Sequence, residues 1–528
     1  MAWNPFFIAL VGVYCAALIL TGVRSARHKG DSNQYLNATS SLPAWVCATA
    51  CVAANCGSIE IFAMTALGAQ YGMLACHFYW IGAIPGLLAV AFWLLPAYKR
   101  SRNPTILDFI GRHYGKPTRS IVALSMAAMM LLIAGVSLCA VAQMGTALLG
   151  WTFLRGVLLS ASVVLFYTWV GGFRATVYTE LLHFALVLAA VVPLPFLAAR
   201  QLGGFRKLMA GIPASRFHAW RQLPLFNPHA TMDVFGLVLG LGLVLGFGFW
   251  GTDFVQMQRA LAVRRDRDAP LVPLSVGFAK LAFSLLIITT GVAAPLVLSS
   301  SRLSANWNGT LPALMMHFYP PFWLVLGFMG LAASVASTFS NNVAGFTSAW
   351  VQGIYQPWLR PDASEQHYTR VSRATNAVVV LLAVGTAYFA LGFQSMMEYI
   401  QWVLAIFNAP IFALVALAAL APRRAAAGGR TGLLCGLACA VAHQVLVLIH
   451  VLRYGSQMTA NFYGAIFGFA ATLACTLWLG SRSQAGGSLP QSRQLSVRPR
   501  TSLAISWPAL AAGIVLAGLF LVFTAIFR

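Results

Sequence analysis

Charged residues are scarce in this sequence. Only 9% of its 528 residues are Asp, Glu, Lys or Arg, and only 11 are acidic, whereas soluble globular proteins carry about 25% charged residues. Hydrophobic residues make up 59% of the chain, and a single soluble core stops growing at roughly 250–300 residues. A soluble globular protein is therefore excluded, and lipid is the expected solvent for most of the chain.

The sequence also lacks the short alternating segments of a transmembrane barrel, whose strands alternate over about 10 residues. Its apolar runs are continuous and about 20 residues long, which is the length of a membrane-crossing helix. We therefore predict an all-α polytopic membrane protein with about 14 transmembrane helices. The predicted spans are 5–23, 42–66, 74–96, 118–143, 148–169, 175–199, 233–257, 270–299, 314–352, 372–393, 396–421, 431–452, 459–480 and 504–526.

Acidic residues are so few that the formal net charge is +23. In a soluble protein this charge would suggest nucleic acid, but in a membrane protein it indicates Lys and Arg gathered in cytoplasmic loops beside anionic lipid. With the N-terminus outside, twenty-four of the 34 basic residues fall in inside loops. We expect a multi-pass protein of the cell membrane, in contact with the bilayer, with both termini extracytoplasmic and no nucleic-acid partner.

Motifs of membrane enzymes and of ATP-driven pumps are absent as well. The sequence contains no HExxH, no GxSxG and no P-loop, and its 10 histidines are scattered. We therefore expect no enzyme and no organic cofactor, although an intramembrane enzyme stays open as an alternative. The informative residues are the polar ones at membrane depth.

The second predicted span contains a polar interruption, Asn55-Cys56-Gly57-Ser58, followed by Glu60. Asn, Gly and Ser in succession weaken a helix, and helices broken at the midplane expose carbonyls that can coordinate a cation. The alternative is a close helix contact made by small residues.

The ninth predicted span carries a polar stripe. Ser334, Ser337, Thr338 and Asn341 are spaced at i, i+3, i+4 and i+7, which places them on one helix face. Stacked oxygen and amide groups suit sodium, but the same groups could hydrogen-bond to a packed helix for about 0.6 kcal/mol per contact. Glu180, about one turn into the sixth span, is either a buried cation ligand or a carboxylate paired with a neighbouring helix.

Four blocks of the sequence resemble the sodium:solute symporters, the group that contains the sodium/glucose cotransporters and the bacterial proline, galactose and sialic acid symporters. The blocks are Gly171-Gly172-Phe173-Arg174-Ala175-Thr176-Val177-Tyr178-Thr179-Glu180, Phe249-Trp250-Gly251-Thr252-Asp253 with Gln258-Arg259-Ala260-Leu261-Ala262, Ala332 to Asn341, and Glu398-Tyr399-Ile400-Gln401 with Pro410. They occur in the family's order, and the resemblance covers roughly residues 5–480.

The resemblance implies the inverted five-plus-five helix repeat of the leucine transporter. It implies one integral membrane domain over residues 1–528, divided into an extra N-terminal helix at 5–23, a transport core at 42–421 and extra C-terminal helices at 431–526. The coupling ion would be sodium, bound by the carbonyls of Ala53 and Cys56 and by Ser334, Ser337 and Thr338. A second sodium site would use Glu180, Ser337, Ser340 and Asn341, where Glu180 and Asn341 replace the commoner Asp and Ser.

The resemblance also implies a set of substrate-binding residues, in which this sequence departs from the sugar carriers. Glu60 stands where sugar symporters carry Gln or His, Tyr79 stands where they carry Glu, and Gly246 replaces a polar residue that bonds the sugar. A site that loses hydrogen-bond partners discriminates a polyol poorly. The implied residues are Asn55, Glu60, Tyr79, Phe249, Trp250, Lys280 and Gln401.

Glu60, taken as a lone carboxylate facing a dry site, would favour a cation or a proton. We therefore predict sodium-coupled symport of a small organic solute that is not a typical sugar, with an amine-bearing solute preferred. Proton coupling or export by the same fold remains an alternative, as does a membrane sensor.

Overall fold

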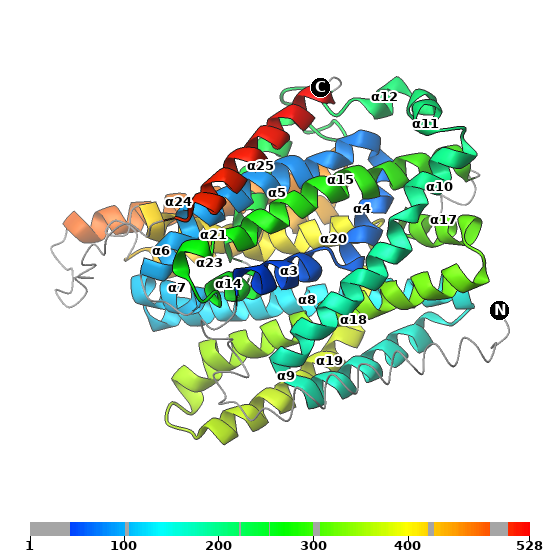
Figure 1. Ribbon diagram of the computed structural model, residues 1–528. Helices are drawn as coiled ribbons and strands as arrows, with labels where there is room; N and C mark the ends of the chain where they lie inside the picture. The colour runs from blue at the N-terminus through cyan, green and yellow to red at the C-terminus, as the bar shows by residue number, and fades with distance from the viewer. Residues whose placement is uncertain are drawn as a thin grey trace.

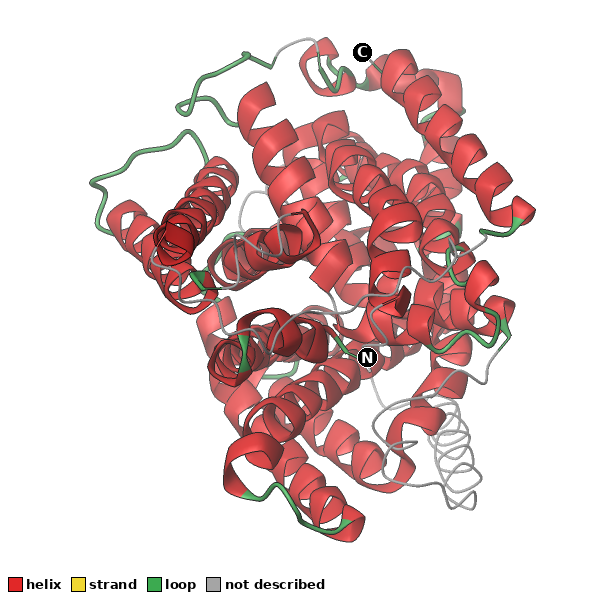
Figure 2. Ribbon diagram, turned by 90° about the vertical axis from the view of Figure 1, so that its left-hand side faces the viewer, coloured by secondary structure: helices red, strands yellow, loops and turns green. Residues whose placement is uncertain are grey.

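The computed structural model describes residues 43–100, 105–220, 223–252, 254–298, 307–420, 427–485 and 505–527, so the span predicted at 5–23 lies outside them. All elements of regular structure in these ranges are helices (Figure 2). In the described part, 10 helices are long and apolar enough to cross a membrane. The all-α membrane class is therefore confirmed, whereas the count of about 14 spans remains a prediction.

The interruption predicted in the second span is present. Helix α3 (Ala44–Asn55) and helix α4 (Ser58–Tyr71) are separated by Cys56 and Gly57, whose backbone leaves the helical region with ψ angles of 43° and 167°. The Asn55 amide Nδ2 donates to the Cys51 carbonyl at 2.8 Å, a side-chain bond within the last turn of α3.

The chain continues in helices that surround this broken helix. They are η1 (Gly72–Cys76), α5 (His77–Ala89), η2 (Val90–Leu94), α6 (Leu95–Arg100), α7 (Ile106–Tyr114), α8 (Lys116–Leu149), α9 (Phe153–Val191) and α10 (Pro193–Gln201), followed by the short α11 (Phe205–Gly211) and α12 (Ala214–Phe217).

Helix α9 differs from the prediction of separate spans at 148–169 and 175–199. It is one helical run of 39 residues, which would measure about 58 Å if it were straight, far more than the roughly 30 Å of a hydrocarbon core. Figure 1 shows that its two halves run in different directions. The hydrophobicity pattern predicted a loop between residues 169 and 175, but the backbone stays helical through the bend.

The chain then continues with further helical segments. The π-helical η3 (Gly236–Gly246) and α13 (Phe247–Thr252) precede Asp253, which lies outside the described residues, and α14 (Phe254–Leu261) follows it. The next elements are η4 (Asp266–Asp268), α15 (Leu271–Val297), η5 (Trp307–Gly309), α17 (Thr310–Phe318), α18 (Pro321–Trp350), η6 (Val351–Leu359), α19 (Glu365–Ala390), α20 (Met396–Val403), η7 (Leu404–Asn408) and α21 (Ala409–Leu420).

Three further helices complete the chain, namely α23 (Gly429–Leu448), α24 (Gln457–Ala485) and α25 (Trp507–Ile526). Helix α25 packs along α5 and α15 (Figure 1). At its end the Phe527 carbonyl accepts a hydrogen bond from the Ala219 N–H at 3.0 Å, and the Phe527 ring lies 5.6 Å from the ring of Trp80. The helix therefore covers part of the core bundle.

The broken helix lies at the centre of the bundle. Helix α4 contacts α15, α18, α20 and α8, and α3 contacts α15 and α9. Residues near the break therefore meet side chains from distant parts of the chain.

Candidate substrate cavity and ion site

A cavity of about 230 Å³ lies beside the break between α3 and α4. All seven residues predicted to bind substrate line it, which are Asn55, Glu60, Tyr79, Phe249, Trp250, Lys280 and Gln401. They come from α3, α4, α5, α13, α15 and α20, so the fold brings together side chains that the sequence keeps far apart.

Glu60 is not the lone carboxylate that the sequence analysis assumed. The Lys280 ammonium forms an ion pair with Glu60 Oε2, and the side chains of Lys280 and Glu60 are only 5% and 17% exposed. Lys280 Nζ also donates to the Asn55 carbonyl at 3.0 Å. The assumption was wrong because 220 positions separate the two residues in sequence, and only the packing of α15 against α4 brings them into contact.

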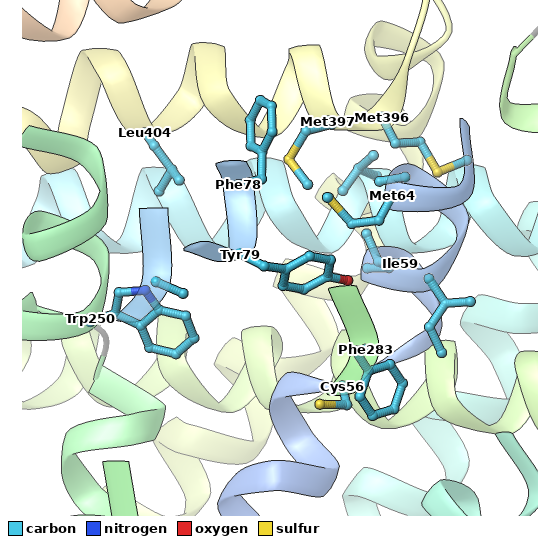
Figure 3. Packing of buried hydrophobic residues seen from close by; sticks show 14 of the residues in the cluster. Cys56, Ile59, Met64, Phe78, Tyr79, Trp250, Phe283, Met396, Met397 and Leu404 are labelled. Carbon is cyan, nitrogen blue, oxygen red and sulfur yellow. The ribbon is translucent and has the colours of Figure 1, made fainter. Parts of the chain in front are cut away.

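Aromatic rings surround the Lys280 ammonium. Its Nζ lies 5.6 Å from the Tyr79 ring centroid and 5.5 Å from the nearest Trp250 ring, within the range of a cation–π attraction. Trp250 is held in place because its Nε1 donates to the Gly82 carbonyl at 3.0 Å, and the Phe249 ring meets it edge to face at 5.1 Å. Figure 3 shows Tyr79 directed toward the segment that carries Cys56 and Ile59.

Gly246 has a geometric role that explains the missing polar side chain. A Cβ atom at Gly246 would lie 2.5 Å from the Gly82 carbonyl oxygen, closer than a real contact allows. The η3 segment can therefore approach α5 only without a side chain at this position. The close approach leaves this point of the cavity wall without a side chain.

Two buried acceptor atoms face the cavity without a hydrogen bond of normal geometry to the described residues. They are Glu60 Oε1 and Gln401 Oε1. The Tyr79 hydroxyl interacts with Glu60 both electrostatically and through a side-chain hydrogen bond whose geometry is not normal. A buried acceptor without a partner is costly, so these atoms favour a solute that brings hydrogen-bond donors.

The helix break also packs against the polar stripe of α18. The Ser58 N–H donates to Ser334 Oγ at 2.8 Å, and Ser58 Oγ donates to the Leu331 carbonyl at 2.7 Å. A Cβ atom at Gly57 would lie 2.8 Å from Thr338 Oγ1, and Thr338 lines the cavity. Glycine is therefore required for this approach, which places the break beside the predicted sodium ligands.

The predicted sodium ligands differ in what the structure shows of them. Ala53, Cys56, Ser334 and Ser337 are buried with exposed fractions of 8%, 1%, 5% and 7%. Ser334 has a structural role that was not predicted, because its hydroxyl accepts from the first N–H of α4. Thr338 Oγ1 donates to the Ser334 carbonyl at 3.1 Å, which leaves its lone pairs available for an ion.

For the predicted second sodium site, Ser340 and Asn341 are buried, and Asn341 also lines the cavity. The side chain of Glu180 lies outside the described residues, although its backbone belongs to α9. The second site remains a prediction.

Several cavity residues were not predicted. They are largely apolar, and Met64, Phe78, Met129, Met130 and Met397 are among them. Figure 3 shows Phe78 and Met397 facing one another. Apolar residues within spans give no sequence signal that separates a cavity wall from ordinary core, although Met129 and Met130 are adjacent and methionine adapts readily to varied ligands. Asn342 also lines the cavity and follows directly after the predicted stripe.

A small cavity beside an interrupted helix, at the centre of a membrane-spanning bundle, is typical of a secondary transporter. The chain matches the sodium:solute symporter family over residues 35–436. It belongs to that family, and it is a multi-pass membrane transporter rather than an enzyme, with sodium as the coupling ion that the family implies.

Relatives with curated names are sodium cotransporters. A sodium/glucose cotransporter of Vibrio parahaemolyticus is 24% identical over 422 residues, covering 75% of this chain and 77% of that protein. A sodium/mannose cotransporter of Bos taurus is 26% identical over 484 residues, covering 84% of this chain and 79% of that protein.

Solved structures support the fold. A Na⁺-coupled sialic acid symporter in a substrate-bound outward-open state has a TM-score of 0.75 at 16% identity, covering 91% of this chain and 98% of that one. MhsT in complex with L-phenylalanine has a TM-score of 0.52 at 15% identity, covering 84% of this chain and 99% of that one. The inverted-repeat fold expected from the sequence is therefore confirmed.

Proposed function

We propose that the protein transports a small organic solute together with sodium, and that the solute is not a typical sugar but carries an amine. The observation that carries this proposal is Glu60 Oε1, a buried acceptor that lines the cavity and has no hydrogen bond of normal geometry to the described residues. A protonated amine is a charged donor, and a carboxylate oxygen binds such a donor about twice as strongly as a neutral one.

The cavity wall argues against a polyol. A sugar needs several hydrogen-bond partners, whereas this wall is largely apolar, Glu60 already holds Lys280 through one oxygen, and Gly246 offers no side chain. The relatives named for glucose and mannose share less than a third of their residues with this chain. A change of cargo within the same fold is consistent with that distance, because function follows the site rather than the fold.

For the coupling sodium we propose the carbonyl oxygens of Ala53 and Cys56 and the hydroxyls of Ser334, Ser337 and Thr338. The approach of Gly57 to Thr338 Oγ1 supports this assignment, since it brings the open backbone of the break to the hydroxyl face of α18. A second sodium at Glu180, Ser337, Ser340 and Asn341 is also proposed. Glu180→Gln should then lower the number of sodium ions moved per solute, measured as the ratio of labelled sodium to labelled solute taken up.

The test is solute uptake into proteoliposomes at varied sodium concentration, with Ser337→Ala and Thr338→Ala beside the wild type. Each variant should raise the sodium concentration for half-maximal uptake, because water replaces a lost ligand poorly. Linkage requires that solute affinity at fixed sodium fall by the same factor. Ser162→Ala is a matched control, since this exposed hydroxyl bonds the carbonyl of Leu158 within its own helix.

The alternatives predict different results. If Ser337 and Thr338 only pack helices together, their variants will lower the yield of folded protein and leave the sodium curve of the folded fraction unchanged. Uptake driven by a pH gradient and indifferent to sodium would indicate proton coupling instead. Loss of preloaded solute against a sodium gradient, without uptake in the reverse orientation, would indicate an exporter.

A further inference from the structure

The charges in the cavity balance. Glu60 and Lys280 are the charged side chains among its described lining residues, and they form an ion pair with one another. The two side chains together add no net charge that a solute would have to neutralise. A solute with one anionic and one cationic group can pair with both of them.

Each member of the pair has capacity for one more partner. An ammonium has three N–H donors, and Lys280 uses two of them for the Asn55 carbonyl and Glu60 Oε2. The remaining direction is bordered by the rings of Tyr79 and Trp250. On the other side of the pair, Glu60 Oε1 has no hydrogen bond of normal geometry to the described residues. The pair can thus accept one anionic and one cationic group.

We infer that the transported solute is a zwitterion whose amine and acid group are close together, as in an α-amino acid. The amine binds Glu60 Oε1, and the acid group binds the Lys280 ammonium. This inference rests on the proposed function and refines it, since it adds an anionic group to the amine. Because Glu60 and Lys280 touch, neighbouring charges on the solute complete a ring of four alternating charges, whereas widely separated charges cannot reach both partners.

The rest of the cavity describes the solute's body. Its wall includes Met64, Phe78, Met130 and Phe249, which suit an apolar side chain. The volume of about 230 Å³ exceeds the roughly 30 Å³ of one water several-fold, which fits a single amino acid with an apolar side chain. Gln401 Oε1, buried and without a normal hydrogen bond in the described residues, is a further acceptor on a residue that lines the cavity.

The experiment measures thermal stabilisation of the purified full chain in sodium and in potassium by matched solutes, since a ligand of the folded state raises stability by mass action. The probes are leucine, methionine and phenylalanine, each with its amide, which is a cation, and its N-acetyl derivative, which is an anion. ε-Aminocaproate, an isomer of leucine with distant charges, and glucose complete the set. At least one of the three amino acids should bind about tenfold or more tightly than its amide, its N-acetyl form and ε-aminocaproate.

Two variants make the charge assignment specific. In Glu60→Gln the amine loses its partner while the acid group still binds Lys280, so the amino acid and its N-acetyl form should bind equally well. In Lys280→Met the acid group loses its partner while the amine still binds Glu60, so the amino acid and its amide should bind equally well. A cooperative melting transition without solute identifies the folded protein in each preparation, so a misfolded variant is recognised and excluded whether or not sodium binds.

The outcomes separate the two proposals. The zwitterion inference is wrong if an amide, an N-acetyl form or glucose binds as tightly as the amino acids, or if no amino acid binds. It is also wrong if Glu60→Gln and Lys280→Met show the same charge preference. If the amino acids bind with the expected preference but equally in sodium and potassium, the inference stands and the proposed sodium coupling fails.

Discussion

Gly57 is the position where a single added carbon tests the sodium site most directly. In Gly57→Ala the new Cβ would lie 2.8 Å from Thr338 Oγ1 and 3.6 Å from Ser334 Oγ. Ordinary van der Waals contact begins at 3.4 Å, so either the break or the Thr338 side chain must move by about 0.6 Å, the difference between 2.8 and 3.4 Å, and both displace the hydroxyl from the break. Alanine also favours a helix over glycine by about 1 kcal/mol, which opposes the break.

The expected effect on sodium follows from that displacement. A functional site must hold its groups within about 0.5 Å of the productive geometry, and a 1 Å misplacement can cost about a hundredfold in an active site. A shift of about 0.6 Å between the break and Thr338 should therefore raise the half-maximal sodium concentration by about tenfold. The chain should still insert and fold, because the change is one methyl group at an existing interruption.

The assay is sodium-dependent uptake or sodium-dependent thermal stabilisation of purified protein. Gly385→Ala in α19 is the matched control, since a Cβ atom there meets nothing within 4 Å. The control should follow the wild-type sodium curve. If Gly57→Ala also follows it, while binding solute normally, the coupling ion does not lie between the break and Thr338, and the assignment is refuted.

Three further predictions concern stability and topology. Glu60→Gln and Lys280→Met should each lower the thermal midpoint, because removing one partner of a buried ion pair costs about 3–5 kcal/mol. The double variant should recover part of this loss. If the effects of the two single variants simply add in the double variant, the two residues are not coupled. Gly246→Ala should lower the midpoint by the equivalent of about 1–3 kcal/mol, since its Cβ would lie 2.5 Å from the Gly82 carbonyl oxygen, while Gly518→Ala, with open space around it, should not. Cysteines placed one at a time at Gly486 to Ser492 should react only from the cytoplasmic side of cells, and labelling from outside would reverse the proposed extracytoplasmic termini.

Local composition was sufficient to predict the helix break and the residues around it. Asn, Gly and Ser inside an apolar run are unfavourable in a helix wherever the segment packs, so the interruption after Asn55 could be predicted without tertiary information. The family resemblance then placed Tyr79, Trp250, Lys280 and Gln401 at the same site, and the structure finds all of them lining one cavity.

Contacts between distant residues could not be predicted in this way. The pairing of Lys280 with Glu60 depends on how α15 packs against α4, and the capping of Ser58 by Ser334 depends on the depth of α18 relative to the break. Neither leaves a periodic signal in the sequence. The consequence was chemical, because an isolated carboxylate and a paired one favour different solutes.

The packing of α25 on α5 and α15 bears on how the protein is made. A ribosome delivers these helices to the membrane in order, so α5 and α15 are inserted well before the chain reaches Phe523 and Phe527, which pack against Trp80. Until then, lipid or a chaperone must occupy the face that α25 later covers. Variants that weaken this contact should therefore slow biogenesis and expose nascent protein to membrane proteases, even where the mature transporter, once assembled, turns over normally.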